Sequence, residues 1–157
     1  MDIIPLTDVN RTAVDLFIRD EWGGPMVVSL GKLYDTSKLP GFIAVMDSRQ
    51  MGAVLYRLEN DECEIEVLYS VEQNRGAGTA LLDKIVAMAK KMGLRRVFLI
   101  TTNDNAHAIR FYQRYGFSLK AVHIGSLAAG RLLKPGIPAT GIDGIPLEHE
   151  FEFEILI

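Results

Sequence analysis

Gln73-Asn74-Arg75-Gly76-Ala77-Gly78-Thr79-Ala80-Leu81-Leu82 is the stretch that decides the fold, because it joins a strand-like segment to a helix-like one. Residues 64–69 before it alternate in polarity, and apolar residues after it recur at helical spacing. The first amides of a helix have no acceptor within the helix and lie at the positive end of its dipole. Glycines at 76 and 78 lack the side chain that would keep a ligand away. The stretch therefore predicts a binding site for a phosphate group.

Two common phosphate loops do not match this stretch. A P-loop requires a lysine after its last glycine, but Gly78 is followed by Thr79. A dinucleotide fingerprint requires a third glycine three residues after the second, where this chain has Leu81. The pattern that does match is Gln/Arg-x-x-Gly-x-Gly/Ala, through Gln73, Gly76 and Gly78. Since a Gly-x-Gly turn also occurs for purely structural reasons, a second motif is needed to identify the ligand.

Length, charge and cysteine content restrict the class of protein. A chain of 157 residues suits one domain, 1–157, with a substantial core. The formal net charge of −3, without a basic run, gives no reason to expect nucleic acid or a membrane surface as a partner. The single cysteine, Cys63, fits a reducing compartment, and the chain shows no signal peptide, membrane-length apolar run or metal-ligand spacing. We therefore expect a soluble cytoplasmic protein without a metal.

The order of predicted elements indicates a mixed α/β (α+β) fold. A helix is predicted from Thr7-Asp8 to about Glu21, a second from the glycine loop to Gly93, and a third over 106–115. Residues 22–40 are predicted to form a loop or short helical segment, and 125–147 a long irregular connection, which in a compact domain is usually functional. Predicted strands cover residues 2–6, 42–47, 52–59, 62–69, 96–100, 117–124 and 148–156.

Two of these strands carry rows of glutamates. Strict alternation places Glu62, Glu64, Glu66 and Leu68 on one face of the strand 62–69, with Cys63 on the other. In the strand 148–156, the glutamates at 148, 150, 152 and 154 share one face. One hypothesis is that both rows line an acidic substrate pocket that favours a cationic amine. The alternative is that they are solvated strand faces, above all at 152 and 154.

The second motif is Asn105-Ala106-His107-Ala108-Ile109-Arg110-Phe111-Tyr112-Gln113-Arg114-Tyr115-Gly116-Phe117, about thirty residues after the glycine loop. It resembles the Asn-x-x-Ala-x-x-Phe-Tyr-x-x-x-Gly-Phe pattern of the GCN5-related N-acetyltransferases, the GNAT family, whose acetyl-CoA loop the first motif also resembles. The motifs cover about residues 40–124, and the order of elements extends the resemblance to nearly the whole chain. Residues 22–23 and 134–150 also resemble a group of uncharacterised bacterial members.

The resemblance implies a mixed, mostly antiparallel sheet of about seven strands with flanking helices, in which two strands splay into a V that holds acetyl-CoA. Loop amides would hold the pyrophosphate. Strand backbone groups and an asparagine would hold the pantetheine arm, although that asparagine may serve only as a helix cap. Gln73 stands where many members have arginine, so we assign it no charge. The implied acetyl-CoA site consists of Val67, Leu68, Gln73, Asn74, Arg75, Gly76, Ala77, Gly78, Thr79 and Asn105.

The resemblance also implies the chemistry. Tyr112 would protonate the departing thiolate, since a phenol with a pKa of about 10 can donate to a thiolate whose conjugate acid lies near ~8.5 to 10. The structural alternative is that Tyr112 only packs in the core. The attacking amine needs a base, for which Glu64 and Glu66 are the first candidates, with Glu150 and His123 behind them.

These residues together predict an N-acetyltransferase that moves an acetyl group from acetyl-CoA to a primary amine by direct attack in a ternary complex. The acceptor is a small-molecule or peptide amine that the sequence does not identify. An acyl-CoA-binding regulatory or partner module with little turnover is the alternative. Because the family often pairs through its C-terminal strands, we also expect a homodimer.

Overall fold

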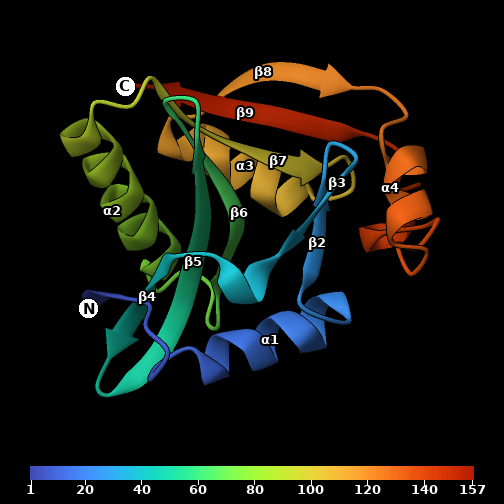
Figure 1. Ribbon diagram of the computed structural model, residues 1–157. Helices are drawn as coiled ribbons and strands as arrows, with labels where there is room; N and C mark the ends of the chain where they lie inside the picture. The colour runs from blue at the N-terminus through green and yellow to red at the C-terminus, as the bar shows by residue number, and fades with distance from the viewer. The chain divides into compact units, whose positions relative to one another are not determined.

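The computed structural model describes residues 1–157, which divide into two compact units (Figure 1). The first unit comprises Met1–Pro25, Asp35–Val97 and Leu156–Ile157. The second comprises Met26–Tyr34 and Phe98–Ile155. Each unit is thus assembled from segments that are distant in the sequence. One N-acetyltransferase domain over 1–157 stays a prediction.

The fold is mixed α/β, with four α-helices and a seven-stranded sheet whose described pairings are antiparallel. This confirms the predicted fold class and the predicted number of strands in the main sheet. Two further strands form a separate hairpin. The V-shaped splay stays a prediction.

The first unit contains four antiparallel strands in the order β1-β4-β5-β6. Two of its hairpins turn at Asp47-Ser48 and Asn60-Asp61, where all four residues have positive φ. Turns of this kind match the twist of the flanking strands, and short polar side chains tolerate them better than bulky ones do. The strands are β1 (Asp2–Pro5), β4 (Gly41–Met46), β5 (Arg49–Glu59) and β6 (Glu62–Ser70).

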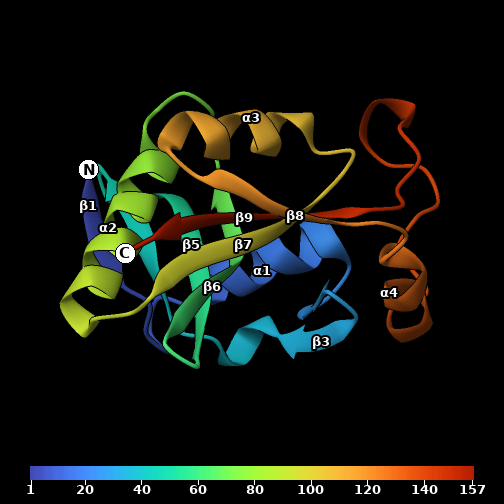
Figure 2. The same cartoon turned by 90° about the horizontal axis from the view of Figure 1, so that it is seen from above.

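Helix α2 (Ala77–Met92) packs against this part of the sheet (Figures 1 and 2). It ends as predicted at Gly93, whose φ of 69° lets its amide donate to the Lys90 carbonyl. The glycine loop therefore lies at the amino end of a helix that is anchored to the sheet. The anchoring side chains are completely buried: Leu81, Leu82, Ile85 and Ala89.

Helix α1 (Thr12–Trp22) begins later than predicted, and the predicted start at Thr7-Asp8 is wrong. The Thr7 amide instead donates to Asn10 Oδ1 at 2.7 Å, and the Asn10 side-chain amide donates to the Pro5 carbonyl at 3.1 Å. A side chain that satisfies the backbone in a turn competes with helix formation, so the helix starts after it.

The second unit contains β7, β9 and β8, adjacent in that order, with α3 (Ala106–Tyr115) alongside them (Figure 2). Strand β8 pairs with β9 from Ser118 opposite Glu154 to His123 opposite Glu150. Helix α3 has its predicted bounds. The strands are β7 (Arg96–Thr102), which enters this unit at residue 98, β8 (Ser118–His123) and β9 (Glu150–Leu156).

The predicted loop over 22–40 is wrong for residues 26–35, which form the hairpin β2 (Met26–Ser29) and β3 (Lys32–Asp35). It turns at Leu30-Gly31, with φ of 47° and 73°, and a 3₁₀ turn, η1 (Thr36–Lys38), follows. Strands of four residues are too short to show a clear alternation, which explains the error.

The connection 125–147 is less irregular than predicted, since it contains α4 (Leu127–Leu133) and a 3₁₀ turn, η2 (Ile142–Gly144). Gly130 lies inside α4, where the helix approaches β2. A Cβ atom at Gly130 would lie 3.2 Å from Val28 Cγ1, which is tighter than ordinary packing. Close packing therefore accounts for this glycine.

Candidate active site

The glycine loop leads into the amino end of α2. Residues 71–76 are exposed, and α2 starts at Ala77 after Gly76, which has a φ of 80°. No Asp or Glu lies in the first turn of α2, so no carboxylate of that turn competes for its amides. Arg75 Nε is 2.9 Å from Glu72 Oε2, with both side chains more than half exposed. Such an exposed pair contributes little stability and can exchange for a phosphate.

The loop glycines support this arrangement. Gly76 has a left-handed conformation, and a Cβ atom there would meet nothing within 4 Å. Glycine suits this position because of its backbone freedom, since residues with a Cβ adopt this φ less readily. Asn74 has a φ of 63°, a conformation that asparagine tolerates better than most residues. Asn74 and Gly76 thus both have left-handed conformations directly before α2.

Asn105 is the N-cap of α3, as the structural alternative predicted. Its Oδ1 accepts a hydrogen bond from the Ala108 amide at 3.1 Å. A cap of this kind satisfies one amide that lacks an acceptor within the helix. With Oδ1 accepting this bond, Nδ2 can still donate one to a pantetheine arm. The cofactor role of Asn105 stays a prediction.

Tyr112 is buried, with 8% of its surface exposed. Its ring lies edge-on to Phe111 and Phe117, with centroid distances of 5.4 and 5.6 Å. The predicted core packing of this residue is thus observed, and it does not exclude a catalytic role. Burial raises the pKa of Tyr112 well above its usual value, so the phenol carries its proton at any physiological pH.

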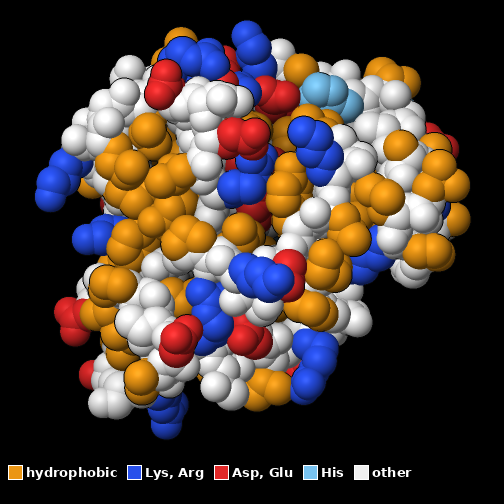
Figure 3. Space-filling model, viewed as in Figure 1, with side chains coloured by type: hydrophobic (Ala, Val, Ile, Leu, Met, Phe, Trp, Pro, Cys, Tyr) orange, Lys and Arg blue, Asp and Glu red, His pale blue; other side chains and the backbone are white.

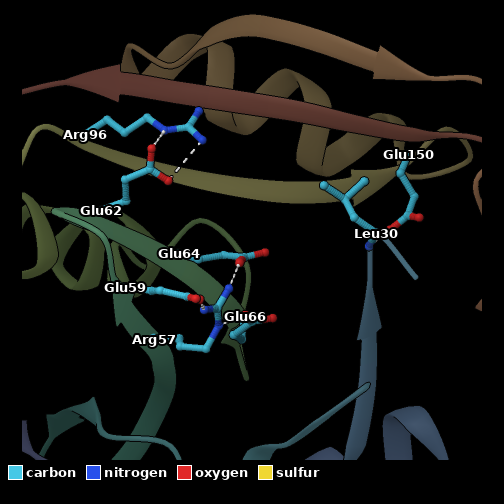
Figure 4. A network of polar contacts seen from close by, with 8 residues as sticks. All are labelled: Leu30, Arg57, Glu59, Glu62, Glu64, Glu66, Arg96 and Glu150. Carbon is cyan, nitrogen blue, oxygen red and sulfur yellow. Dashed lines mark hydrogen bonds and ion pairs between the residues drawn. The ribbon is translucent and has the colours of Figure 1, made fainter. Parts of the chain in front are cut away.

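Glu64 and Glu66 lie together against Arg57, which the sequence did not single out (Figure 4). Arg57 on β5 is directly opposite Glu64 on β6. The register shifts at a bulge, where Leu55 pairs with Val67 and the next residue pairs with Ile65, so that Glu66 is the extra residue. The bulge and the shared face bring both carboxyl groups to one guanidinium group.

The pKa of Glu66 reflects this arrangement. Burial is the largest cause and raises it, the charge of Glu64 raises it further, and Arg57 lowers it, which leaves the pKa at about 8. Glu66 therefore holds a proton at neutral pH and releases it in mildly basic solution. A candidate base whose pKa lies near the working pH is well suited to accept a proton.

Other glutamates of β6 and β9 also have partners. Arg96 Nε lies 3.0 Å from Glu62 Oε1 (Figure 4). Arg95 bonds the same carboxylate. His123 Nε2 lies 3.1 Å from Glu152 Oε1. Glu152 is only 8% exposed, so the alternative of a solvated strand face is wrong for this residue. The face in Figure 3 shows acidic and basic side chains interspersed rather than one acidic area.

Glu150 differs from the other members of its row. It is 2% exposed, and its Oε2 accepts a hydrogen bond from the Leu30 amide at 3.3 Å (Figure 4). Its Oε1 is buried without a hydrogen-bond partner. Because this carboxyl group supports the turn between β2 and β3, it has a structural function, and its role as a base stays a prediction.

The predicted site residues are distributed over both units. Val67 and Leu68 of β6 pair with Leu55 and Val54 of β5 and belong to the first unit, as do Glu64, Glu66 and the glycine loop. Asn105 and Tyr112 belong to the second unit. Sequence reasoning missed Arg57, although the turn at Asn60-Asp61 fixes the register that places it opposite Glu64.

Cys63 has no feature of a nucleophile. It is completely buried, and burial raises the pKa of its thiol to about 12. Cys63 therefore packs as a small apolar side chain. The structure contains no group of three or more His, Cys, Asp and Glu side chains placed to hold a metal ion, and no helix with the length and apolar character needed to cross a membrane.

The sequence of residues 10–117 matches the family model described as the acetyltransferase (GNAT) family. This chain belongs to that family. It is 37% identical to the uncharacterised protein YxbD of Bacillus subtilis strain 168 over 151 residues, which cover 96% of this chain and 95% of YxbD. It is 36% identical to the uncharacterised protein YdhI of the same strain over 158 residues, which cover 100% of this chain and 99% of YdhI.

The fold is also similar to solved structures. A GNAT family acetyltransferase from Elizabethkingia anophelis, solved with acetyl-CoA bound, superposes with a TM-score of 0.74. The match covers 99% of this chain and 97% of the other, at 18% sequence identity. At that identity the likeness establishes the fold.

Proposed function

We propose that the protein transfers an acetyl group from acetyl-CoA to a primary amine. The observation that carries the proposal is the amino end of α2, which follows the exposed loop 71–76 and has no carboxylate in its first turn. In a member of the GNAT family, this helix end suits the pyrophosphate of acetyl-CoA. A structural neighbour with bound acetyl-CoA supports the same donor.

In the proposed complex, the amides of residues 75–79 hold the pyrophosphate. Backbone groups of Val67 and Leu68, with Asn105 Nδ2, hold the pantetheine arm. The acceptor amine loses a proton to the Glu64–Glu66 pair, and its nitrogen then attacks the thioester carbonyl. A nitrogen–carbon bond forms, the carbon–sulfur bond breaks, and the departing thiolate takes a proton from Tyr112. The attacking nitrogen loses its second proton as it becomes an amide, and this proton restores the Tyr112 phenol. Both substrates are bound during this direct transfer.

The raised pKa of Tyr112 restricts how it can act. A free thiol has a pKa of about 8.5, so proton transfer from Tyr112 to a solvated thiolate is unfavourable. A buried thiolate is more basic, because burial disfavours its charge as it disfavours that of the phenolate. We therefore propose that Tyr112 donates its proton while the sulfur is still enclosed by the protein.

The acceptor is proposed to be a small-molecule or peptide amine. The charges around the β6 glutamates give little support for a strongly cationic acceptor, because these three carboxylates and that of Glu59 on β5 meet three guanidinium groups. With a proton on Glu66, this group of side chains is neutral. The carboxylates are those of residues 59, 62, 64 and 66, and the guanidinium groups those of residues 57, 95 and 96.

The experiment combines calorimetric titration with acetyl-CoA and measurement of CoA release on a broad panel of amines. Acetyl transfer predicts binding of acetyl-CoA and CoA release above background hydrolysis with at least one amine. Binding without amine-dependent release supports the alternative, an acyl-CoA-binding regulatory module. Tight binding of ATP or NAD without competition from CoA would contradict both.

A cytoplasmic homodimer is also proposed. Strand β8 is at the end of the strand order, and its side chains Leu119 and Val122 are 52% and 41% exposed. An edge strand with exposed apolar side chains can pair with a second copy. Light scattering should give twice the chain mass of 17.5 kDa, and a value near 17.5 kDa would contradict the dimer.

A further inference from the structure

Arg57 holds two buried carboxyl groups on one guanidinium group (Figure 4). Its Nη2 lies 2.6 Å from Glu64 Oε2, and its Nε lies 3.3 Å from Glu66 Oε1. The side chains of Glu64 and Glu66 are 6% and 2% exposed. A third partner, Glu59, is 58% exposed and therefore well screened by solvent. The buried part of this group therefore contains two carboxyl groups and one guanidinium group.

Two carboxyl groups this close do not ionise independently. A hydrogen bond joins Glu64 and Glu66, and the charges that act on Glu66 are those of Glu64 and Arg57. Glu59 is bound to Arg57, and Glu62 is bound to Arg95 and Arg96. The charge of Glu64 therefore favours a proton on Glu66, and Arg57 is the cation that opposes this effect.

We propose that Arg57 is a positioning residue for acetyl transfer, because it holds the carboxyl groups of Glu64 and Glu66 together and sets the pH at which Glu66 accepts a proton from the amine. This inference rests on the proposed function. The proton leaves the amine nitrogen and reaches a carboxylate oxygen of Glu66 through a water molecule, since Glu66 itself is nearly inaccessible. Arg57 keeps its protons and its positive charge throughout, because a guanidinium group is not deprotonated in proteins.

The arrangement predicts opposite effects for two substitutions. Arg57→Met removes the cation, so the midpoint of the Glu66 titration rises by about 1 to 3 pH units. Glu64→Gln removes the like charge and keeps Arg57, so the midpoint falls. Arg19→Met removes an exposed arginine of α1 and is the matched control, for which no shift is expected. A residue that serves only the folding of the protein would not produce shifts of opposite sign.

The experiment is a carbon-13 NMR titration of the glutamate side-chain carboxyl groups in the full-length protein, with Glu66→Gln used to assign the resonance. The pH profile of kcat is measured for the same variants. We expect a wild-type midpoint near 8, the opposite shifts in the two variants and parallel movement of the kcat profile. A wild-type midpoint near 4.5, shifts of the same sign or an unmoved kcat profile would overturn the proposal.

Two further measurements separate the outcomes. If circular dichroism shows that Arg57→Met does not fold, Arg57→Lys replaces it. Lysine retains the positive charge but lacks the branched guanidinium group, so the midpoint of the Glu66 titration should rise by less. Glu64→Gln still tests the sign of the shift. If no amine is acetylated, the proposed function fails and the catalytic part of the proposal fails with it. The NMR titration would still decide whether Arg57 sets the midpoint of the Glu66 titration.

Discussion

Thr79→Glu should stabilise the protein and weaken acetyl-CoA binding at the same time. Thr79 is exposed and is the third residue of α2, whose first turn contains no acidic side chain. A glutamate there interacts favourably with the helix dipole, which is worth about 0.3 to 1 kcal/mol. The same charge would lie beside the pyrophosphate. At a separation of ~4 Å, two like charges repel by about 1 kcal/mol in water and about 4 kcal/mol near a protein surface.

The expected loss of affinity is thus between about fivefold and several hundred-fold, with the Tm unchanged or raised. Thr79→Gln is the matched neutral control. The assays are thermal unfolding without ligand and calorimetric titration with acetyl-CoA at two salt concentrations, because screening should reduce the difference at high salt. The reasoning is refuted if Thr79→Glu raises the Tm but binds acetyl-CoA within twofold of Thr79→Gln.

Three further outcomes are expected. Tyr112→Phe should lower kcat by about 10²- to 10⁴-fold with unchanged affinity for acetyl-CoA. An unchanged kcat would show that Tyr112 serves only core packing. Glu66 loses its proton near pH 4.5 when unfolded and near pH 8 when folded, so its contribution to stability is present below pH 4.5 and declines as pH rises to 8. In chemical denaturation, Glu66→Gln should remove this decline of a few kcal/mol, and an identical pH dependence would contradict it. Gly52→Ala should destabilise the folded protein by about 1 to 3 kcal/mol, because its Cβ would lie 2.3 Å from the Tyr69 carbonyl oxygen. Gly136→Ala is the control and should be close to neutral, because a Cβ there meets nothing within 4 Å. Equal Tm values for the two variants would contradict this.

The parts of the fold that were predictable have strong local signals. Helix α3 has an asparagine cap at its start and a glycine at its end, and α2 has an apolar row that repeats at helical spacing. The hairpin β2–β3 was missed because four-residue strands show no clear period. Helix α4 was missed because it contains a glycine, Gly130, whose close packing against Val28 involves residues more than a hundred positions apart.

The candidate site was predictable to a similar extent. Strand alternation placed Glu64 and Glu66 on one face, and both contact Arg57. Their protonation was not predictable from alternation, because it depends on burial and on the bulge next to Tyr56. The partner of Glu152 was also hidden, since His123 comes from a different strand. Charge rows in a sequence therefore overstate the charge that a folded site presents.

The most direct test of acetyl transfer uses acetyl-CoA with an isotopically heavy acetyl group and mass spectrometry of a mixture of primary amines. The account predicts that at least one amine gains the heavy acetyl group in the presence of the protein. Product formation should fall at least about a hundredfold with Tyr112→Phe. Wild-type protein that binds acetyl-CoA but yields no heavy acetylated amine would contradict the account.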